Sequence, residues 1–445
     1  MPKSVLYKNH FRTTNDVLSG SEDDSEGAFT EAPAWGRLPK VTVARAYLLF
    51  AGIVAFGYII TFAWRRSPWP LGDWLINYSG GFVRRGLPGF CIHLIAPQFH
   101  MSLVAGAASL QAACILCLVA GLWPLMSQIF RPGSALWERA LLFSPATLAF
   151  FWLDPSLILR KEIGLFAVLC VLILLLRHRP AVSDPWVSIF LSLACPALLL
   201  SHEGLVCYMP YVAAVVALGL RDLMRAFKVC VVPGVLSVAA VAVASTHPGN
   251  QIISSKICAS IGGPSELCQG PIGYIGISSS QYAGEVAGLF QDKRLVVVFL
   301  ITGFLALLPT LAGLLDFWKK PVSRNTKAVL PATFILSAAL SIVLFVQAQD
   351  WSRWIYIHIM CLMLMLFFAV DQRANDLRVS EKAVIVKRSR KWVFVATLAV
   401  IVYATTWRLP EWILLGARDY RPFGYSNLLQ RVDRHSGALS GDLRR

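Results

Sequence analysis

Long runs of apolar residues recur along the whole chain and are separated by short polar segments. Most runs are long enough for an α-helix to cross a hydrocarbon core, which takes roughly 17–25 residues. Within each run the apolar positions are continuous rather than alternating, and this excludes a membrane β-barrel. The pattern therefore predicts an all-α, polytopic integral membrane protein.

Eleven apolar segments are expected to be transmembrane helices. Two of them, residues 140–153 and 186–201, are short, so they are expected to be tilted, broken or only partly inserted. The eleven segments are residues 45–64, 102–128, 140–153, 163–176, 186–201, 204–220, 229–245, 295–317, 328–346, 355–370 and 392–407.

The composition agrees with this pattern, because 56% of the 445 residues are hydrophobic and only 15% are charged. Soluble domains carry about 25% charged residues. The net charge of +16 is compatible with nucleic-acid binding. It is better explained by the Lys and Arg residues that collect in the cytoplasmic loops of membrane proteins.

The distribution of Lys and Arg predicts a cytoplasmic N-terminus. In that orientation the cytoplasmic segments carry 24 of these residues and the outer loops carry 10. The bias requires residues 140–153 to cross the membrane, since otherwise every later loop would change sides. The C-terminal tail runs against the bias, because its 7 Lys and Arg fall on the outer side.

Three regions are expected along the chain. Residues 1–43 are polar and lack the apolar core of a signal peptide, so they are expected to be a mostly disordered cytoplasmic tail. Residues 44–408 form the transmembrane domain, and residues 409–445 form a polar C-terminal tail. The outer loops are residues 65–101, 154–162, 246–294 and 347–354.

The unusual polar residues fall at the outer ends of the expected helices. The stretch "GDWLINYSGGFVRRGLPG", which starts at Gly72, is the first example. Ionisable groups at mid-membrane cost roughly 2.5–3.5 kcal/mol each, so they persist where they are paired or face water. The outer helix ends therefore predict a shared polar cavity. Its candidate residues are Asp73, Asn77, Tyr78, Arg84, Arg85, Asp154, Arg160, Lys161, His202, Glu203, Asp350, Trp351 and Arg353.

Each candidate also has a simpler explanation when it is taken alone. Asp73 can be a helix N-cap, and Arg84 with Arg85 can bind lipid headgroups. His202 with Glu203 can form a helix–helix contact, and Trp351 can belong to an aromatic belt. The convergence of acids and bases on one face favours a cavity for an anionic, membrane-delivered substrate.

Ten cysteines are present, and eight of them lie in or beside apolar segments. Cys258 and Cys268 differ, because they share the longest polar loop. They are expected to form a disulfide if that loop faces an oxidising compartment. No cysteine spacing indicates a metal site, and no cofactor is expected, although a need for a divalent metal stays open.

In layout, residues 45–220 resemble the polytopic glycosyltransferases of the GT-C type, which use polyprenyl-phosphate-linked sugars. In that class an acidic residue in the first outer loop is the usual catalytic base. A partly helical stretch then follows the membrane surface, and a second acidic motif lies between helices three and four. Asp73 with Asn77, the stretch "GGFVRRGLPGFCIHLI" and Asp154 in "DPSLILRKE" match these features in turn.

The resemblance implies sugar transfer from a lipid-linked donor at the outer face of the inner membrane, in cell-surface polysaccharide or glycan assembly. Asp73 would be the catalytic base, with Asp154 as the competing candidate. The donor phosphate would be bound by Arg84, Arg85, Arg160, Lys161 and Arg353. Substrate hydroxyls would be oriented by Asn77, Tyr78, His202, Glu203, Asp350 and Trp351.

The implied partners are membrane lipid, the lipid-linked donor and a glycan or lipid acceptor, without nucleic acid. Three alternatives stay open. The chain can be an O-antigen or exopolysaccharide polymerase, a transporter or flippase for a lipid-linked or anionic solute, or a non-catalytic assembly subunit. The absence of internal repeats and the clustering of polar residues at one face favour an enzyme over a transporter.

Overall fold

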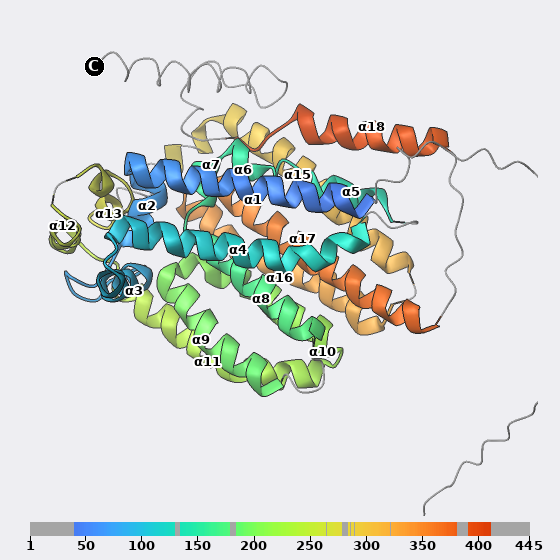
Figure 1. Cartoon of the computed structure of the whole chain (residues 1–445), viewed down its shortest axis with the longest axis horizontal. Coiled ribbons are helices and arrows are strands. Elements are labelled where there is room, and N and C mark those ends of the chain that lie inside the picture. Colours follow the sequence, from blue (N-terminus) through green and yellow to red (C-terminus); the bar gives the residue numbers. More distant parts are fainter. Residues whose placement is uncertain are drawn as a thin grey trace, which may run out of the picture. The chain divides into compact units, whose positions relative to one another are not determined.

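The computed structural model of the chain describes residues 40–129, 134–178, 184–263, 265–277, 284, 286–288, 290–320, 322–380 and 390–410. All of them belong to one compact unit, Pro39–Arg445. These residues form helices and no β-strand, which confirms the all-α prediction (Figure 1). The expected polar tails lie almost entirely outside the described residues.

The helices follow one another with short connections (Figure 1). The first half comprises α1 (Lys40–Arg65), α2 (Pro68–Leu75), α3 (Leu87–Ile95), η2 (Ala96–Phe99), α4 (Leu103–Ile129), α5 (Leu136–Leu142), α6 (Phe150–Leu153), α7 (Pro155–Ile158), α8 (Ile163–His178) and α9 (Asp184–Ser201). The second half comprises η3 (Glu203–Tyr208), α10 (Met209–Leu220), α11 (Leu223–Ser245), α12 (Gln251–Ser260), η4 (Glu266–Gln269), α13 (Pro271–Tyr274), α15 (Lys293–Lys319), α16 (Arg324–Gln347), α17 (Trp351–Ser380) and α18 (Arg390–Thr406).

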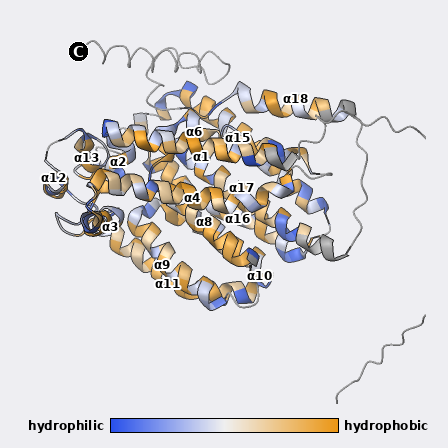
Figure 2. Ribbon diagram, viewed as in Figure 1, coloured by the Kyte–Doolittle hydropathy of each residue, from blue (hydrophilic) through white to orange (hydrophobic). Residues whose placement is uncertain are grey.

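Eight helical segments of the described chain are long and apolar enough to cross a membrane, so this is a multi-pass membrane protein by length and composition. They correspond to α1, α4, α9, η3 with α10, α11, α15, α16 and α17. Three shorter apolar segments, Leu87–Phe99, Ile163–Arg177 and Phe394–Thr406, accompany them. Figure 2 shows the apolar character of these helices along most of their length.

Two short segments turn out differently from one another. Residues 184–201 form one continuous helix, α9, of sufficient length to span. Residues 140–153 are broken: α5 ends at Leu142 and α6 begins at Phe150. Pro145 explains the break, because proline lacks an N–H and disfavours a helical residue before it. The hydroxyl of Thr147 then donates to the carbonyl of Leu141, 2.8 Å away.

The broken segment still carries the chain from one end of the bundle to the other. At its start, Trp137 Nε1 donates to Asp316 Oδ2 at 3.0 Å, near the C-terminal end of α15. At its end, the Lys161 ammonium lies 3.7 Å from Asp73, just beyond α1. This part of the chain therefore runs along the bundle without forming a continuous third helix.

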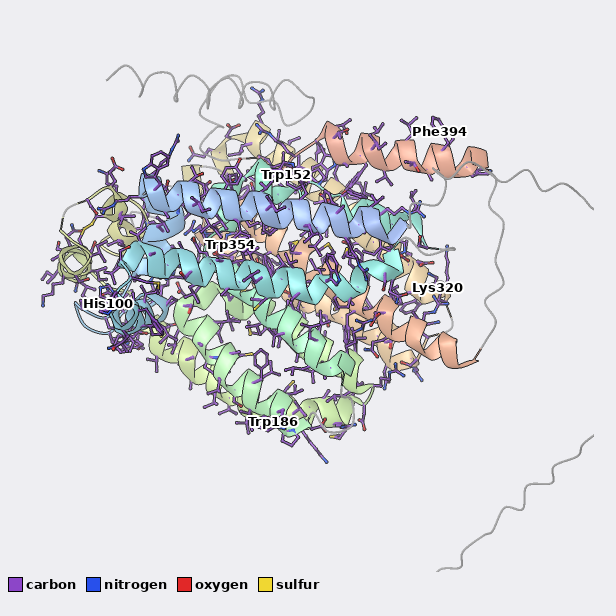
Figure 3. The ribbon with its side chains drawn as sticks, in the orientation of Figure 1. His100, Trp152, Trp186, Lys320, Trp354 and Phe394 are labelled. Atoms are coloured by element: carbon purple, nitrogen blue, oxygen red, sulfur yellow. A yellow bond between two sulfur atoms is a disulfide. The ribbon has the colours of Figure 1, made fainter. Side chains whose placement is uncertain are left out.

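The centre of the bundle is α17, where nearly every residue from Tyr356 to Val370 is buried. It packs against α4, α8, α10, α15 and α16. Figure 3 shows Trp354 of α17 inside the bundle, whereas the exposed residues Trp186 and Phe394 lie on α9 and α18.

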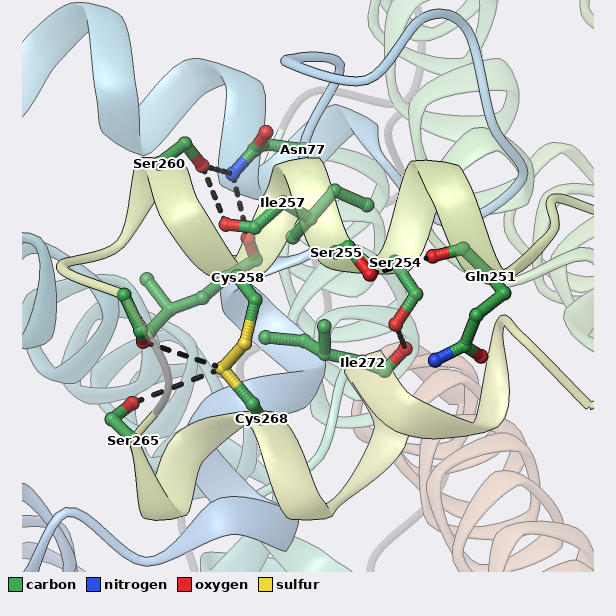
Figure 4. Close-up of a disulfide and its surroundings, with 12 residues drawn as sticks. Asn77, Gln251, Ser254, Ser255, Ile257, Cys258, Ser260, Ser265, Cys268 and Ile272 are labelled. Carbon is green, nitrogen blue, oxygen red and sulfur yellow. Dashed lines mark hydrogen bonds between the residues drawn. A yellow bond between two sulfur atoms is a disulfide. The ribbon is translucent and has the colours of Figure 1, made fainter.

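The segment after α11 folds over α2 and is closed by a disulfide. Cys258 of α12 and Cys268 of η4 are bonded, with their Cα atoms 5.8 Å apart (Figure 4). A Cβ added to Gly72 would lie only 2.7 Å from the carbonyl oxygen of Leu267, so α2 and η4 are in close backbone contact. This segment therefore holds the helix that carries Asp73.

Because α4 packs closely against α8, we expect alanine substitution to have very different effects on stability at two glycines of the spanning helices. A Cβ at Gly121 would lie 2.3 Å from Cys170 Cβ, whereas nothing lies within 4 Å of one at Gly57. Gly121→Ala should destabilise the protein by about 1–3 kcal/mol through overpacking. Gly57→Ala, the matched control, should leave the thermal midpoint in detergent nearly unchanged. Equal midpoints for the two variants would contradict the α4–α8 packing.

Candidate functional site

Charged residues from separate parts of the chain meet at one end of the bundle. Asp73 lies in α2, which starts at the proline-rich stretch "PWP" directly after α1. Arg160, Lys161 and Glu162 lie in the turn between α7 and α8. His202 and Glu203 stand between α9 and α10, and Asp350 and Arg353 stand at the start of α17. The sequence analysis expected this convergence of outer segments, apart from Glu162.

The innermost contact joins α2 to the turn before α8. Asp73 is fully buried, with Arg160 Nε 3.6 Å from its Oδ2 and Lys161 Nζ 3.7 Å from its Oδ1. The backbone N–H of Lys161 also donates to Asp73 at 3.4 Å. Burial would raise the pKa of Asp73, but the positive charges of Lys161 and Arg160 outweigh it and hold this pKa well below its usual range. Asp73 is therefore ionised in this arrangement.

Lys161 also connects Asp73 to the loop between α2 and α3. Its ammonium donates to the backbone carbonyl of Arg85 at 2.6 Å. Burial lowers the pKa of Lys161 to about 8, although Asp73 opposes this shift. Lys161 therefore remains mostly charged at neutral pH.

The edge of the site is the arginine pair of the loop between α2 and α3, Arg84 and Arg85. Arg85 donates to both carboxylate oxygens of Glu203, at 2.6 Å from Nη2 to Oε1 and 3.0 Å from Nε to Oε2. Arg84 lies 3.4 Å from the same carboxylate. The side chains of Arg84 and Arg85 are 35% and 26% exposed, so they are the most accessible cations of the site.

Asp350 at the start of α17 and Glu162 in the turn before α8 are a second pair of carboxylates in the site. Asp350 Oδ2 accepts a hydrogen bond from Arg160 Nη1 at 3.1 Å and forms an ion pair with Arg353 Nη2 at 2.9 Å. Arg353 Nη1 also lies 3.3 Å from Glu162 Oε1, and its guanidinium stands 4.5 Å from the ring centroid of Trp354. The same Glu162 oxygen lies 3.3 Å from His202 Nε2.

These contacts form one continuous set, which we call the charge network. Its members are Arg84, Arg85, Arg160, Lys161, Arg353, Asp73, Glu162, Glu203, Asp350 and His202. Five cations face four carboxylates, so an excess of one positive charge remains when His202 is neutral. Such a network is suited to an anionic ligand, because the ligand can replace a carboxylate as the group that an arginine binds.

Three predicted site residues make contacts that fix the local structure. The Asn77 amide donates to the carbonyl of Leu75 and to the hydroxyl of Ser260, which joins the first loop to α12 (Figure 4). Trp351 donates to the carbonyl of Phe345. Asp154 lies between α6 and α7 and accepts a hydrogen bond from the hydroxyl of Ser156 at 2.9 Å.

Tyr78 differs from these residues. Its ring stacks on Phe82 at a centroid distance of 4.9 Å, and its buried hydroxyl has no hydrogen-bond partner among the described residues. The roles in substrate orientation expected for Asn77, Tyr78 and Trp351 stay predictions.

Glu162 is the network member that sequence reasoning left out of the site. The available signal was its place beside Arg160 and Lys161 in "LILRKEIG" at the start of an apolar run. Within the described residues no group of three or more His, Cys, Asp or Glu side chains has the arrangement of a metal site.

Comparisons with known proteins do not identify a family for this chain. No protein-family model, curated protein or solved structure matches the chain. The functional argument therefore depends on the charge network and on its place at the end of a membrane-spanning bundle.

The buried Asp73–Lys161 contact predicts strong energetic coupling. Asp73→Asn or Lys161→Met alone leaves a buried charge with fewer partners and should destabilise the protein by about 3–5 kcal/mol. The double variant should be destabilised by less than the sum of the two single effects. The difference, which is the coupling free energy, should be roughly 0.5–3 kcal/mol in thermal or denaturant unfolding.

The matched control is Lys320→Met, which removes a partly exposed cation that pairs with Asp316 four residues earlier. It should cost at most about 1 kcal/mol. Strictly additive effects of Asp73→Asn and Lys161→Met would show that the two side chains do not interact.

Proposed function

We propose that the chain is a membrane glycosyltransferase that takes a sugar from a polyprenyl-phosphate-linked donor at the outer face of the membrane. The observation that carries the proposal is the charge network at the ends of membrane-spanning helices, with a partly exposed arginine pair at its edge. A lipid-linked donor presents its phosphate at this level of the membrane. A cationic excess beside apolar helices fits such a ligand.

Phosphate binding is assigned first to Arg84 and Arg85. Arginine offers a planar fork that matches phosphate oxygens in a bidentate way. In the resting arrangement Glu203 occupies this fork, so the donor phosphate replaces a carboxylate rather than entering an empty site. The buried cations Arg160, Lys161 and Arg353 add a fixed positive field that stabilises the leaving phosphate.

Asp73 is assigned as the proton acceptor, with Asp154 as the competing candidate. While Lys161 and Arg160 hold Asp73, its carboxylate is a weak base. A donor phosphate that draws these cations toward itself makes the carboxylate more basic. Asp73 then accepts the proton of the acceptor hydroxyl, the hydroxyl oxygen bonds to the anomeric carbon, and the sugar–phosphate bond breaks to release polyprenyl phosphate.

The disulfide supports an outer position for the site. Disulfides persist in oxidising compartments, and the Asn77–Ser260 hydrogen bond places the Cys258–Cys268 segment against the loop that carries the arginine pair. We therefore propose a cytoplasmic N-terminus, eleven crossings that include the broken segment 140–153 and the short helix α18, and a GT-C-like core.

One observation favours the transporter as a second candidate. His358 lies inside the span of α17 and bonds to the Tyr211 hydroxyl at 3.0 Å and to the Ser341 hydroxyl at 2.8 Å. Intramembrane polar groups often line ion or substrate paths. Both ring nitrogens of His358 are occupied by neighbouring helices, however, as in interhelical hydrogen bonds that stabilise a bundle.

Arg84→Gln tests the enzyme. It removes a charge-assisted contact worth about 1.5–3 kcal/mol, so transfer should fall roughly 10- to 100-fold. In cells that carry this variant as their only copy, mass spectrometry of lipid extracts should show accumulated polyprenyl-phosphate-linked saccharides. Arg65→Gln, an exposed arginine at the end of α1, is the matched control and should not accumulate them.

Normal membrane levels of both variants are required for this comparison. Unchanged lipid-linked saccharides together with altered solute movement across the membrane would favour the transporter. Unchanged saccharides and unchanged movement would favour an assembly subunit.

Labelling of introduced cysteines tests the orientation. Gln98 and Lys228 are both exposed, the first beside α3 at the site end and the second near the start of α11. In intact cells a membrane-impermeant maleimide should label Gln98→Cys above the background of the unsubstituted chain. It should label Lys228→Cys only after permeabilisation, and the reverse result would invert the proposed topology.

A further inference from the structure

Glu203 is the most accessible carboxylate of the charge network. Its side chain is 19% exposed, whereas those of the other three carboxylates are 14% exposed or less. It contacts Arg84 and Arg85, which are also the most accessible cations of the network. A ligand that binds this arginine pair therefore arrives beside Glu203.

The same two arginines are the cations that lie within 4 Å of Glu203 among the described residues. Arg85 uses Nε and Nη2, the two donors of one guanidinium edge, to bind both carboxylate oxygens. A phosphate that takes this edge removes the bidentate partner of Glu203. The exchange therefore leaves acceptor oxygens without their donors directly beside the bound phosphate.

The remaining cations of the network are already engaged. Each of them pairs with another carboxylate, and moving it to Glu203 would leave that carboxylate short of a partner. The donors that Glu203 needs after the exchange must therefore come from the ligand. The engaged cations are Arg160, Lys161 and Arg353, and their partners are Asp73, Glu162 and Asp350.

The chemistry of a carboxylate restricts which ligand groups can serve. An ionised carboxylate only accepts hydrogen bonds, so an apolar group or a second anion beside Glu203 would leave it unpaired, at a cost that opposes binding. Hydroxyl groups are neutral and can donate. A sugar that is linked directly to the phosphate carries hydroxyls on neighbouring carbon atoms, and two of them match the two oxygens of one carboxylate.

Aromatic rings border the arginine pair. A Cβ at Gly86, the residue after Arg85, would lie 2.2 Å from Tyr78 Cε1, so the Tyr78 ring packs against the loop at this point. Phe82 stacks on Tyr78 at a centroid distance of 4.9 Å and is itself 37% exposed. These rings offer an apolar surface that suits one face of a sugar ring.

We propose that Glu203, once displaced from Arg84 and Arg85, binds the hydroxyl groups of the sugar whose phosphate has displaced it. This inference rests on the lipid-linked phosphate ligand of the proposed function and adds a specificity determinant to it. Each half of the resting ion pair then has a new partner, because the arginines bind the phosphate and the carboxylate accepts from the sugar. A lipid phosphate without hydroxyls replaces only the first half, so the site discriminates against it.

The test compares phosphodiesters that share a lipid chain, a single negative charge and a six-membered ring but differ in hydroxyl groups. The probes are farnesyl cyclohexyl phosphate and the glucosyl, galactosyl and mannosyl phosphates of farnesol. Native mass spectrometry measures their binding to the full-length protein in lipid nanodiscs, and each affinity is expressed against the mole fraction of probe in the bilayer. The best hexosyl probe should bind roughly 10- to 100-fold more tightly than the cyclohexyl probe, as expected for hydrogen bonds to a charged group.

Glu203→Gln should change the two affinities in opposite directions. Its amide does not hold the arginine pair as an anion does, so the cyclohexyl probe should bind more tightly than it does to the unsubstituted protein. The preference for the hexosyl probe should fall below about threefold, because the charged acceptor is gone. The matched control is Asp184→Asn, which removes a carboxylate that makes a similar two-point contact with Arg225 and should keep the full preference.

Equal affinities of the hexosyl and cyclohexyl probes for the unsubstituted protein would overturn this inference and leave the proposed function intact. A preference that Glu203→Gln retains would do the same, since the hydroxyls would then be recognised elsewhere. If that variant does not fold, Glu203→Asp keeps the charge on a shorter side chain and should lower the preference several-fold, and an unchanged preference would overturn the inference. Failure of every probe to bind the unsubstituted protein would overturn both proposals.

Discussion

The structure depends on one electrostatic constraint: charges that are buried at the ends of apolar helices must neutralise one another. An unpaired ion in a low-dielectric region costs several kcal/mol, and removing one partner leaves that cost in place. Asp73 and Lys161 are both almost fully buried, so each fixes the position of the other. Through Arg160 and Asp350 the same constraint extends to the start of α17. The ends of helices far apart in the sequence are therefore held in one arrangement.

The loop that carries the arginine pair has a strained backbone conformation that the charge contacts stabilise. Arg85 has a φ of 67°, a left-handed conformation that a residue with a side chain adopts at a cost of about 1–3 kcal/mol. Its bidentate contact with Glu203 and the Lys161 contact with its carbonyl offset that cost. On the other side, a Cβ at Gly89 would lie 2.1 Å from the carbonyl of Ile76, so the loop closes only with glycine there. The strained residue is also one of the two most accessible cations of the network.

Hydropathy and charge bias were sufficient to predict the class of the protein and the gathering of polar loops at one end. Both follow from the length of apolar runs and from the alternation of helix directions. The individual pairings could not be predicted, because they depend on the rotation and tilt of each helix. Trp351 and Arg353 stand two residues apart in the sequence, yet only Arg353 reaches the network. A break was one of three outcomes expected for residues 140–153, but hydropathy could not choose among them, since the segment is apolar on both sides of Pro145.

The pairing of charges also constrains how an anionic ligand can bind. A site of free arginines would bind phosphate of any origin, and its selectivity would be small. Here Arg84 and Arg85 contact Glu203. The binding free energy of a ligand is therefore only the difference between the energy of its own contacts and that of the contacts it displaces. An isolated phosphate gains little from that exchange. A phosphate attached to a polyprenyl chain gains the additional burial of the chain against the exposed apolar helices around the site, including Leu94, Ile95 and Phe99. In the proposed function, the resting carboxylate would therefore favour the binding of lipid-linked phosphates over soluble ones.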